Sequence, residues 1–269
     1  MLQNVRKFLP GRRPHVTQSG HCQALDGGPE FVAGRLTTQT GVDMALFNVG
    51  FVIFPNVTQL DFTGPLQVLS GLPQSATHIV AKSMSPVLSD CRLGLVPTNT
   101  FANCPPLDLI CIPGGSEGVA GVLNDGETIA FVRQQAVSAK YVTSVCTGAF
   151  VLGVAGLLRR RRATTHWAYT DLLPLEGAKH EKARVVIDGN VITAGGVTSG
   201  IDFGLAVVAE ISGESIARRI QLGMEYDPAP PFDSGHPDRA PSIRQELMAA
   251  RYDKFRSIYR SRIEQAAQL

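Results

Sequence analysis

The sequence predicts an α/β protein with a doubly wound, mostly parallel sheet and helices on both of its faces. Short apolar runs with the length of buried strands alternate along the chain with segments of helical periodicity. The composition is that of an ordinary globular protein, because 44% of the 269 residues are hydrophobic and 18% are charged. This alternation predicts parallel strands joined by helical crossovers.

The first half of the chain begins with a strand and a helix. The run LFNVGFVIF at 46–54 is apolar enough for a strand that is buried on both faces. A helix is predicted at 58–72, and we expect Pro65 near its start, where proline is tolerated. Asp61 would then lie near the helix N-terminus. Three short strands are predicted next, at 78–82, 107–112 and 141–145. A helix is predicted at 128–139, between the last two of them.

The second half adds an apolar helix, a hairpin and a charged helix. GAFVLGVAGLL, at 148–158, predicts a buried helix directly after Cys146. The runs 185–187 and 191–194 flank Asp-Gly-Asn, which is the turn chemistry of a β-hairpin. The last elements are a helix at 201–211, a proline-rich loop at 228–237 and a final charged helix at 242–267.

The chain is predicted to have three segments. Residues 1–43 are basic and polar and lack the continuous apolar core of a secretory signal, so we expect a poorly ordered extension. Met44 would be the start of the folded domain, which extends over 44–231. Residues 232–269 would form a loop and a helix that packs on the domain or on a partner subunit.

Charge and hydropathy exclude several classes of function. The net charge of +2, with both signs scattered, gives no reason to expect a nucleic-acid partner, so a small-molecule partner is expected. The arginines at 159–162 are interpreted as a solvated loop after a helix C-terminus rather than a phosphate or RNA site. No apolar run approaches the ~20 residues that cross a bilayer, so no membrane association is expected.

Cysteine usage indicates a reducing compartment, and we expect a cytoplasmic protein. The five cysteines, at 22, 91, 104, 111 and 146, form no CxxC pair and no set with zinc-ligand spacing. No metal site is therefore predicted. Cys111 lies in an apolar run and is expected to be a core residue, because free cysteine is among the most buried residue types.

The strongest chemical signal is Cys146. In YVTSVCTGAF, at 141–150, a β-rich run passes without a spacer into a helix. This pattern is typical of a nucleophile elbow, where small neighbours let the chain turn sharply. We expect the dipole of the following helix to lower the pKa of the thiol below its free value of about 8.5. Open α/β sheets carry their sites at the carboxyl ends of strands, so a nucleophile is favoured over a buried cysteine that ends a strand.

Other groups are expected at the same edge of the sheet. Gly114 and Gly115 follow the strand at 107–112, and their N–H groups would form an oxyanion-type hole, although a plain tight turn also explains them. Asp61 would be either a proton shuttle or a helix cap. His166 closes a β-like run after the cysteine and is kept as a wall or orienting residue.

Four motifs, taken in order, resemble the ThiJ/PfpI superfamily: FPNVTQLDFTGP at 54–65, LDLICIPGG at 107–115, YVTSVCTGAFVLG at 141–153 and RRATTHWAY at 161–169. The resemblance covers roughly 44–231 and implies a flavodoxin-like fold and a homodimer. Many members have histidine after the elbow cysteine, whereas Thr147 follows Cys146 here. That departure favours the isonitrile hydratase branch over the peptidase and deglycase branches.

The resemblance implies hydration of an isonitrile to an N-substituted formamide without a cofactor. Cys146 would attack the isonitrile carbon to give a thioimidate, and Asp61 would act as the acid and then as the base. Thr147 would orient Asp61 or the water. The residues expected to contact the substrate or to stabilise its developing charge are Gly114, Gly115, Gly148, His166 and Trp167.

Two other interpretations stay open. A hydrolase of the α/β-hydrolase type would need an acid and a late histidine, for which Asp202 and His236 are available. A ligand or redox sensor is also open, because an accessible thiol of low pKa is what oxidation selects. One charged helix after the domain is too little for a helix-turn-helix reader, so a direct DNA role is not expected.

Overall fold

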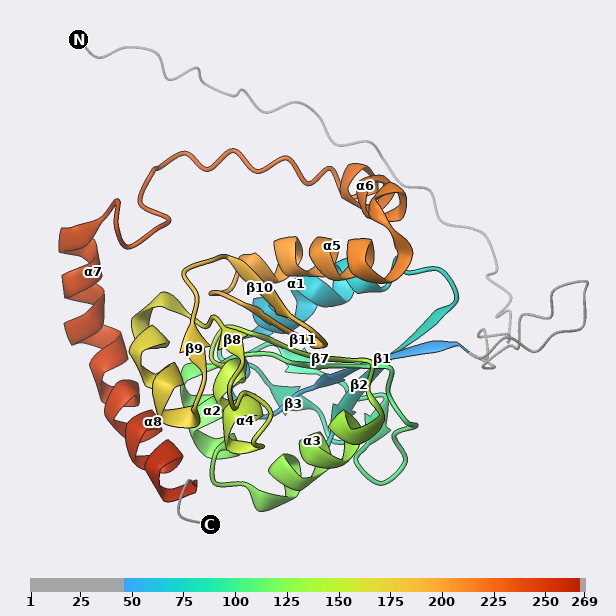
Figure 1. The fold of residues 1–269 in the computed structure, drawn as a ribbon, viewed down its shortest axis with the longest axis horizontal. Coiled ribbons are helices and arrows are strands. Elements are labelled where there is room, and N and C mark those ends of the chain that lie inside the picture. Colours follow the sequence, from blue (N-terminus) through green and yellow to red (C-terminus); the bar gives the residue numbers. More distant parts are fainter. Residues whose placement is uncertain (1–45, 267–269) are drawn as a thin grey trace, which may run out of the picture. The chain divides into compact units, whose positions relative to one another are not determined.

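The computed structural model describes residues 46–266 (Figure 1). The expected extension at 1–43, the proposed start at Met44 and Cys22 lie outside these residues. Within 46–266, the strands and helices alternate and pack around one sheet, as the sequence predicts. None of the helices in this range is long and apolar enough to cross a membrane.

The sheet has seven strands in the order β10-β11-β7-β6-β1-β2-β5. All neighbours pair in parallel except β10 and β11, which form the predicted antiparallel hairpin. The predicted fold class, a doubly wound and mostly parallel sheet, is therefore confirmed. In sheet order the strands are Val185–Asp188, Val191–Ala194, Tyr141–Val145, Leu109–Ile112, Phe47–Val52, Ser75–Ala81 and Asn99–Thr100. Two small sheets pair Val87–Leu88 (β3) with Gly94–Leu95 (β4) and Arg162–Ala163 (β8) with Lys179–His180 (β9).

Helices cover both faces of the sheet (Figure 1). One face carries α1 (Gln59–Leu69) and α5 (Ser199–Ser212), with α6 (Glu214–Gly223) packed on α5. The other face carries α2 (Ser116–Val122), α3 (Gly126–Ser138) and α4 (Gly148–Val154). The remaining elements are the 3-10 helix η1 (Trp167–Glu176), α7 (Pro241–Leu247), the π-helical turn η2 (Met248–Tyr252) and α8 (Asp253–Ala266).

The central strands are buried on both faces because helices cover them. All four residues of β6 are buried, as their continuous apolar sequence predicts. Cys111 is a core residue, as expected, and burial raises the pKa of its thiol to about 12. The site elements therefore stand on a rigid sheet.

Two local predictions for the helices are wrong. Pro65 is the seventh residue of α1 and lies inside the helix, where it cannot donate a hydrogen bond to the carbonyl of Asp61. Its ring packs against α5, where a side chain at Gly200 would lie 2.9 Å from Cδ of the proline. The helix predicted at 148–158 ends at Val154, because Gly156 takes a left-handed φ of 81° and turns the chain.

The segment after the proline-rich loop packs on its own domain. It forms one helical rod, α7–η2–α8, that contacts η1, α2 and α4. Tyr259 and Ile263 are buried, and the guanidinium of Arg256 donates to the carbonyl of Ala168 at 2.8 Å and pairs with Asp171 at 2.6 Å. These contacts fix the rod beside the carboxyl ends of the strands.

A buried glutamate closes η1. Both carboxyl oxygens of Glu176 are buried without a hydrogen-bond partner, and burial raises the pKa of the group well above its ordinary 4.5. A side chain at Gly153 would overlap this carboxyl. Glu176 lines a cavity of about 390 Å³ together with Arg133, Arg159 and Arg160. Burial therefore disfavours the charged form of this carboxyl in the folded protein.

Replacing Glu176 with glutamine should stabilise the protein at pH 8, because the unfolded chain no longer gains by ionising this group. Burial raises the pKa of the folded carboxyl above the 4.5 of the unfolded chain, so the native protein loses stability as pH rises above that value. Urea denaturation at pH 5 and pH 8 measures the effect. The exposed Glu246→Gln is the control. An equal change for the two variants would contradict the prediction.

Candidate active site

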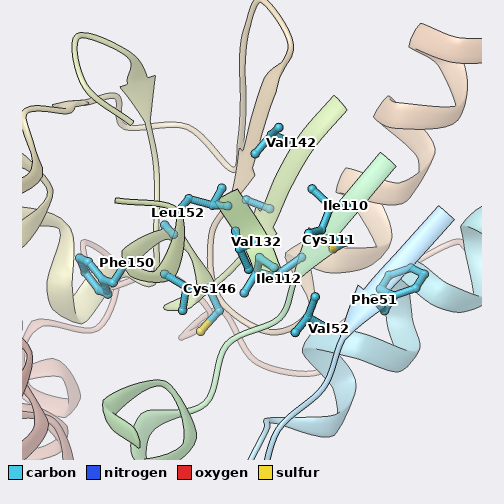
Figure 2. Packing of buried hydrophobic residues seen from close by; sticks show 14 of the residues in the cluster. Phe51, Val52, Ile110, Cys111, Ile112, Val132, Val142, Cys146, Phe150 and Leu152 are labelled. Carbon is cyan, nitrogen blue, oxygen red and sulfur yellow. The ribbon is translucent and has the colours of Figure 1, made fainter. Parts of the chain in front are cut away.

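Cys146 lies on a sharp turn between β7 and α4. It has a positive φ of 58°, which is uncommon for a residue other than glycine. Its N–H donates to the carbonyls of Ala194 and Gly195 at 3.0 and 2.9 Å, and its carbonyl accepts from Oγ1 of Thr165 at 2.7 Å. In Figure 2, Cys146 lies in the cluster of buried residues that also includes Ile112, the last residue of β6. The turn has the geometry of a nucleophile elbow, which the strand-to-helix pattern predicts.

Asp61 lies in the first turn of α1 and faces the thiol. Its carboxyl is fully buried, and burial raises its pKa from 3.8 to about 7. The Cys146 thiol and the backbone N–H groups of Gly114 and Val197 face the carboxyl and moderate that rise, although no contact reaches the geometry of an ordinary hydrogen bond. Of the two predicted roles of Asp61, that of a helix cap is therefore wrong, because its carboxyl makes no hydrogen bond to the N-terminus of α1.

Gly114 makes room for this pair. A side chain at Gly114 would lie 2.6 Å from Oδ2 of Asp61 and 2.7 Å from Cβ of Cys146. Real side chains do not approach so closely, so only glycine lets the carboxyl and the thiol meet. Gly148 is constrained in the same way, because a side chain there would overlap the carbonyl of Ile112.

The thiol of Cys146 is protonated at neutral pH, contrary to the sequence-based expectation. Burial raises its pKa well above 9.0, and the negative charge of Asp61 raises it further. The N–H groups of Thr147 and Val197 favour the thiolate but do not offset these effects. Because α4 has only seven residues, its dipole is too weak to outweigh complete burial.

Thr147 joins the elbow to the loop at 113–115 that follows β6, which we call the glycine loop. Its Oγ1 accepts a hydrogen bond of 3.0 Å from the N–H of Gly115, so that N–H is occupied rather than open as an oxyanion hole. On the other side of the loop, the buried hydroxyl of Tyr259 donates to the carbonyl of Ser116 at 2.7 Å. The loop is thus held between α4 and α8.

Val197 is a functional candidate that the sequence analysis missed. This β-branched residue follows β11 with a φ of 32°, which is strained for an L-residue. The strain directs its N–H toward the carboxyl of Asp61 and the thiol of Cys146. The signal that could have identified it is Gly195-Gly196 at the end of the strand at 191–194, a third strand end at the same sheet edge.

A cavity of about 100 Å³ opens over the thiol. Four of the predicted site residues line it: Gly115, Cys146, Thr147 and His166. The C-terminal rod supplies part of its wall through Arg251 and Tyr252, which the sequence analysis did not place in the site.

His166 is a neutral wall of this cavity. Burial, assisted by the positive charge of Arg251, lowers its pKa from 6.5 to about 4. Its Nδ1 accepts a hydrogen bond of 3.3 Å from the N–H of Ala168 and so begins η1. Trp167 is not part of the cavity wall. It packs behind His166 and against Tyr252, because η1 turns the next side chain outward.

The two residues that an α/β-hydrolase mechanism would need, Asp202 and His236, lie outside the cavity over Cys146. Asp202 pairs with Arg184 and accepts a hydrogen bond of 2.9 Å from the hydroxyl of Tyr226. His236 lies in the exposed proline-rich loop near Asp238. Neither of them lines the cavity over Cys146. Over residues 46–266, no three His, Cys, Asp or Glu side chains are grouped as ligands for a metal ion.

Comparisons with known proteins agree with this geometry. The model of the DJ-1/PfpI family matches residues 48–210. An isonitrile hydratase from Pseudomonas putida is 57% identical over 199 residues, which cover 74% of this chain and 86% of the relative. A ThiJ/PfpI family protein from Pseudomonas syringae has a crystal structure that matches with a TM-score of 0.76 and 41% identity, over 80% of this chain and 91% of that one. A DJ-1 superfamily protein from Salmonella typhimurium matches with a TM-score of 0.62 and 25% identity, over 68% and 100%.

Proposed function

The chain belongs to the DJ-1/PfpI family, and on that premise we propose that it hydrates isonitriles, R–NC, to N-substituted formamides through a covalent intermediate on Cys146. The observation that carries the proposal is the buried Asp61 carboxyl, which faces the Cys146 thiol from behind, while the thiol itself lines the small cavity. The 57% identity to an isonitrile hydratase supports this choice of substrate.

The first step joins the thiol to the substrate. Asp61 takes the proton of the thiol, Sγ of Cys146 forms a bond to the terminal isonitrile carbon, and Asp61 delivers the proton to that same carbon. The product is a thioimidate, R–N=CH–S. A carboxyl with a pKa of about 7 can both accept and donate this proton near neutrality.

Water completes the reaction. It attacks the thioimidate carbon while Asp61 takes one of its protons and passes it to the nitrogen, which gives R–NH–CH(OH)–S. The C–S bond then breaks, the hydroxyl proton returns through Asp61 to the sulfur, and R–NH–CHO leaves. One water is added in total, and no atom of the protein is oxidised or reduced. The N–H groups of Thr147 and Val197 face the sulfur and would stabilise charge that develops there.

The site supports this function better than it supports a redox sensor. Oxidants react with the thiolate, whereas burial and Asp61 keep the Cys146 thiol protonated at neutral pH. The homodimer that the resemblance implies and the cytoplasmic location that cysteine usage indicates stay predictions.

Turnover of cyclohexyl isonitrile by the purified chain in ¹⁸O-labelled water tests the proposal. We expect one N-cyclohexylformamide for each isonitrile consumed, with the label in the carbonyl oxygen, because that oxygen comes from water. Mass spectrometry measures both quantities. A folded protein that yields no formamide from this or from simple alkyl isonitriles would refute the proposal, and peroxide oxidation confined to Cys146 would then favour the sensor.

A further inference from the structure

The C-terminal rod forms a roof over the cavity. The π-helical turn η2 ends at Tyr252, whose ring lies 5.1 Å from the ring of His166 and 5.8 Å from that of Tyr169. Single π-helical turns inside α-helices are frequently found at functional sites. Here the turn places Arg251 and Tyr252, neighbours in the chain, on the same cavity.

The roof is held in place on its far side as well. Arg256 is bound to the carbonyl of Ala168 and to Asp171, and Tyr259 is bound to the glycine loop through the carbonyl of Ser116. The position of Arg251 over the cavity is therefore set by anchored neighbours one and two helical turns further along the rod.

Arg251 gives the cavity one positive charge. It is the only lysine or arginine among the side chains that line the cavity, and no aspartate or glutamate lines it. Within the part of the chain that the structure describes, no carboxylate lies within 4.0 Å of its guanidinium. Its positive charge reaches the interior, since it adds to the effect of burial in lowering the pKa of His166 and offsets part of the rise that burial causes in the pKa of Tyr252. A positive charge at the roof and a reactive thiol in the wall define two ends for a substrate.

We propose that the cavity selects small isonitriles that carry a carboxylate, with the isonitrile carbon at Cys146 and the carboxylate at Arg251. A guanidinium binds a carboxylate through two parallel hydrogen bonds, which are stronger than hydrogen bonds between neutral groups. A cavity of about 100 Å³ suits a short chain between the two groups. The aromatic walls of His166 and Tyr252 suit the methylene groups of that chain. This inference rests on the proposed function and names its substrate class.

The test compares 3-isocyanopropanoate with 3-isocyanopropanamide, which has nearly the same shape but no charge. The wild type should turn over the carboxylate with a kcat/KM about tenfold above that of the amide, since a hydrogen bond between charged groups is stronger than one to a neutral amide. In Arg251→Gln, kcat/KM for the carboxylate should fall by a similar factor, mainly through KM, while the amide changes less than about twofold. Arg251→Lys keeps the charge but not the paired donors. Its kcat/KM for the carboxylate should lie between those of the wild type and Arg251→Gln.

Arg244→Gln is the matched control, because Arg244 is an exposed arginine on α7 of the same rod. It should leave both substrates unchanged, whereas an equal effect in the two variants would mean that only the general field of the protein is involved and would overturn the inference. Equal turnover of carboxylate and amide by the wild type would also overturn it and leave isonitrile hydration intact. No formamide from cyclohexyl isonitrile or from either probe would instead be the failure of the proposed function.

Discussion

Replacing Cys146 with alanine should abolish formamide production, with a loss in kcat of about 10⁴-fold or more, because the variant has no atom that can form the thioimidate. The fold should persist. The side chain has no hydrogen bond within the described residues, and the turn is fixed by backbone contacts to Ala194, Gly195 and Thr165. Circular dichroism checks the fold, and a progress curve of formamide release measures the loss.

Two further measurements separate the nucleophile from a structural thiol. Cys91→Ala, at an exposed cysteine outside the cavity, should keep full activity. Rapid quenching of the wild type with excess isonitrile should give a protein heavier by the mass of one substrate, with the addition at Cys146. If Cys146→Ala kept more than about a tenth of the activity, water would have to attack the isonitrile directly with Asp61 as its base, and the covalent route would be wrong.

The fold could be predicted from the sequence because its central strands carry strong local signals. The strands β1 and β6 lie in apolar runs that end at proline, and β7 is a β-rich run that ends at the elbow cysteine. The hairpin has turn residues that leave few alternatives, and Gly189 takes the positive φ of 63° that such a turn requires. The elbow follows from the same logic, since a strand that runs into a glycine-containing helix must turn at Cys146.

The rest of the site depends on contacts between residues that are distant in the chain. The pKa of the thiol is set by burial and by a carboxyl 85 residues earlier, so the dipole of a short helix was a poor guide to it. Arg251 and Tyr252 reach the cavity only because the C-terminal rod folds back over η1. No local pattern in the sequence indicates that path or the π-helical turn. Trp167 was predicted to contact the substrate, but only its neighbour His166 lines the cavity. No local signal shows which of the two side chains faces the site.

Replacing Asp61 with asparagine should move activity and stability in opposite directions. Without the carboxyl no group relays the thiol proton to the isonitrile carbon, so kcat should fall by about 10²–10⁴-fold. Stability at pH 8 should rise. The unfolded carboxyl ionises near pH 3.8 and the folded one at about 7, so folding loses stability as pH rises between these values, by up to roughly 4 kcal/mol. Asparagine has no such cost.

The pH profile of the wild type carries the same information. Because the carboxylate form of Asp61 accepts the thiol proton, kcat/KM should rise with pH through an apparent pKa of about 7, which belongs to the Asp61 and Cys146 pair. The residual activity of Asp61→Asn should lack this rise. Formamide assays and urea denaturation between pH 5.5 and 8.5 measure both effects, with the exposed Asp227→Asn as the control. A flat wild-type profile, or an asparagine variant as active as the wild type and no more stable, would show that this carboxyl is not the proton relay. A loss of activity joined to a gain in stability would instead mean that the burial of Asp61 destabilises the fold. The same burial provides a carboxyl beside the thiol that titrates near neutral pH.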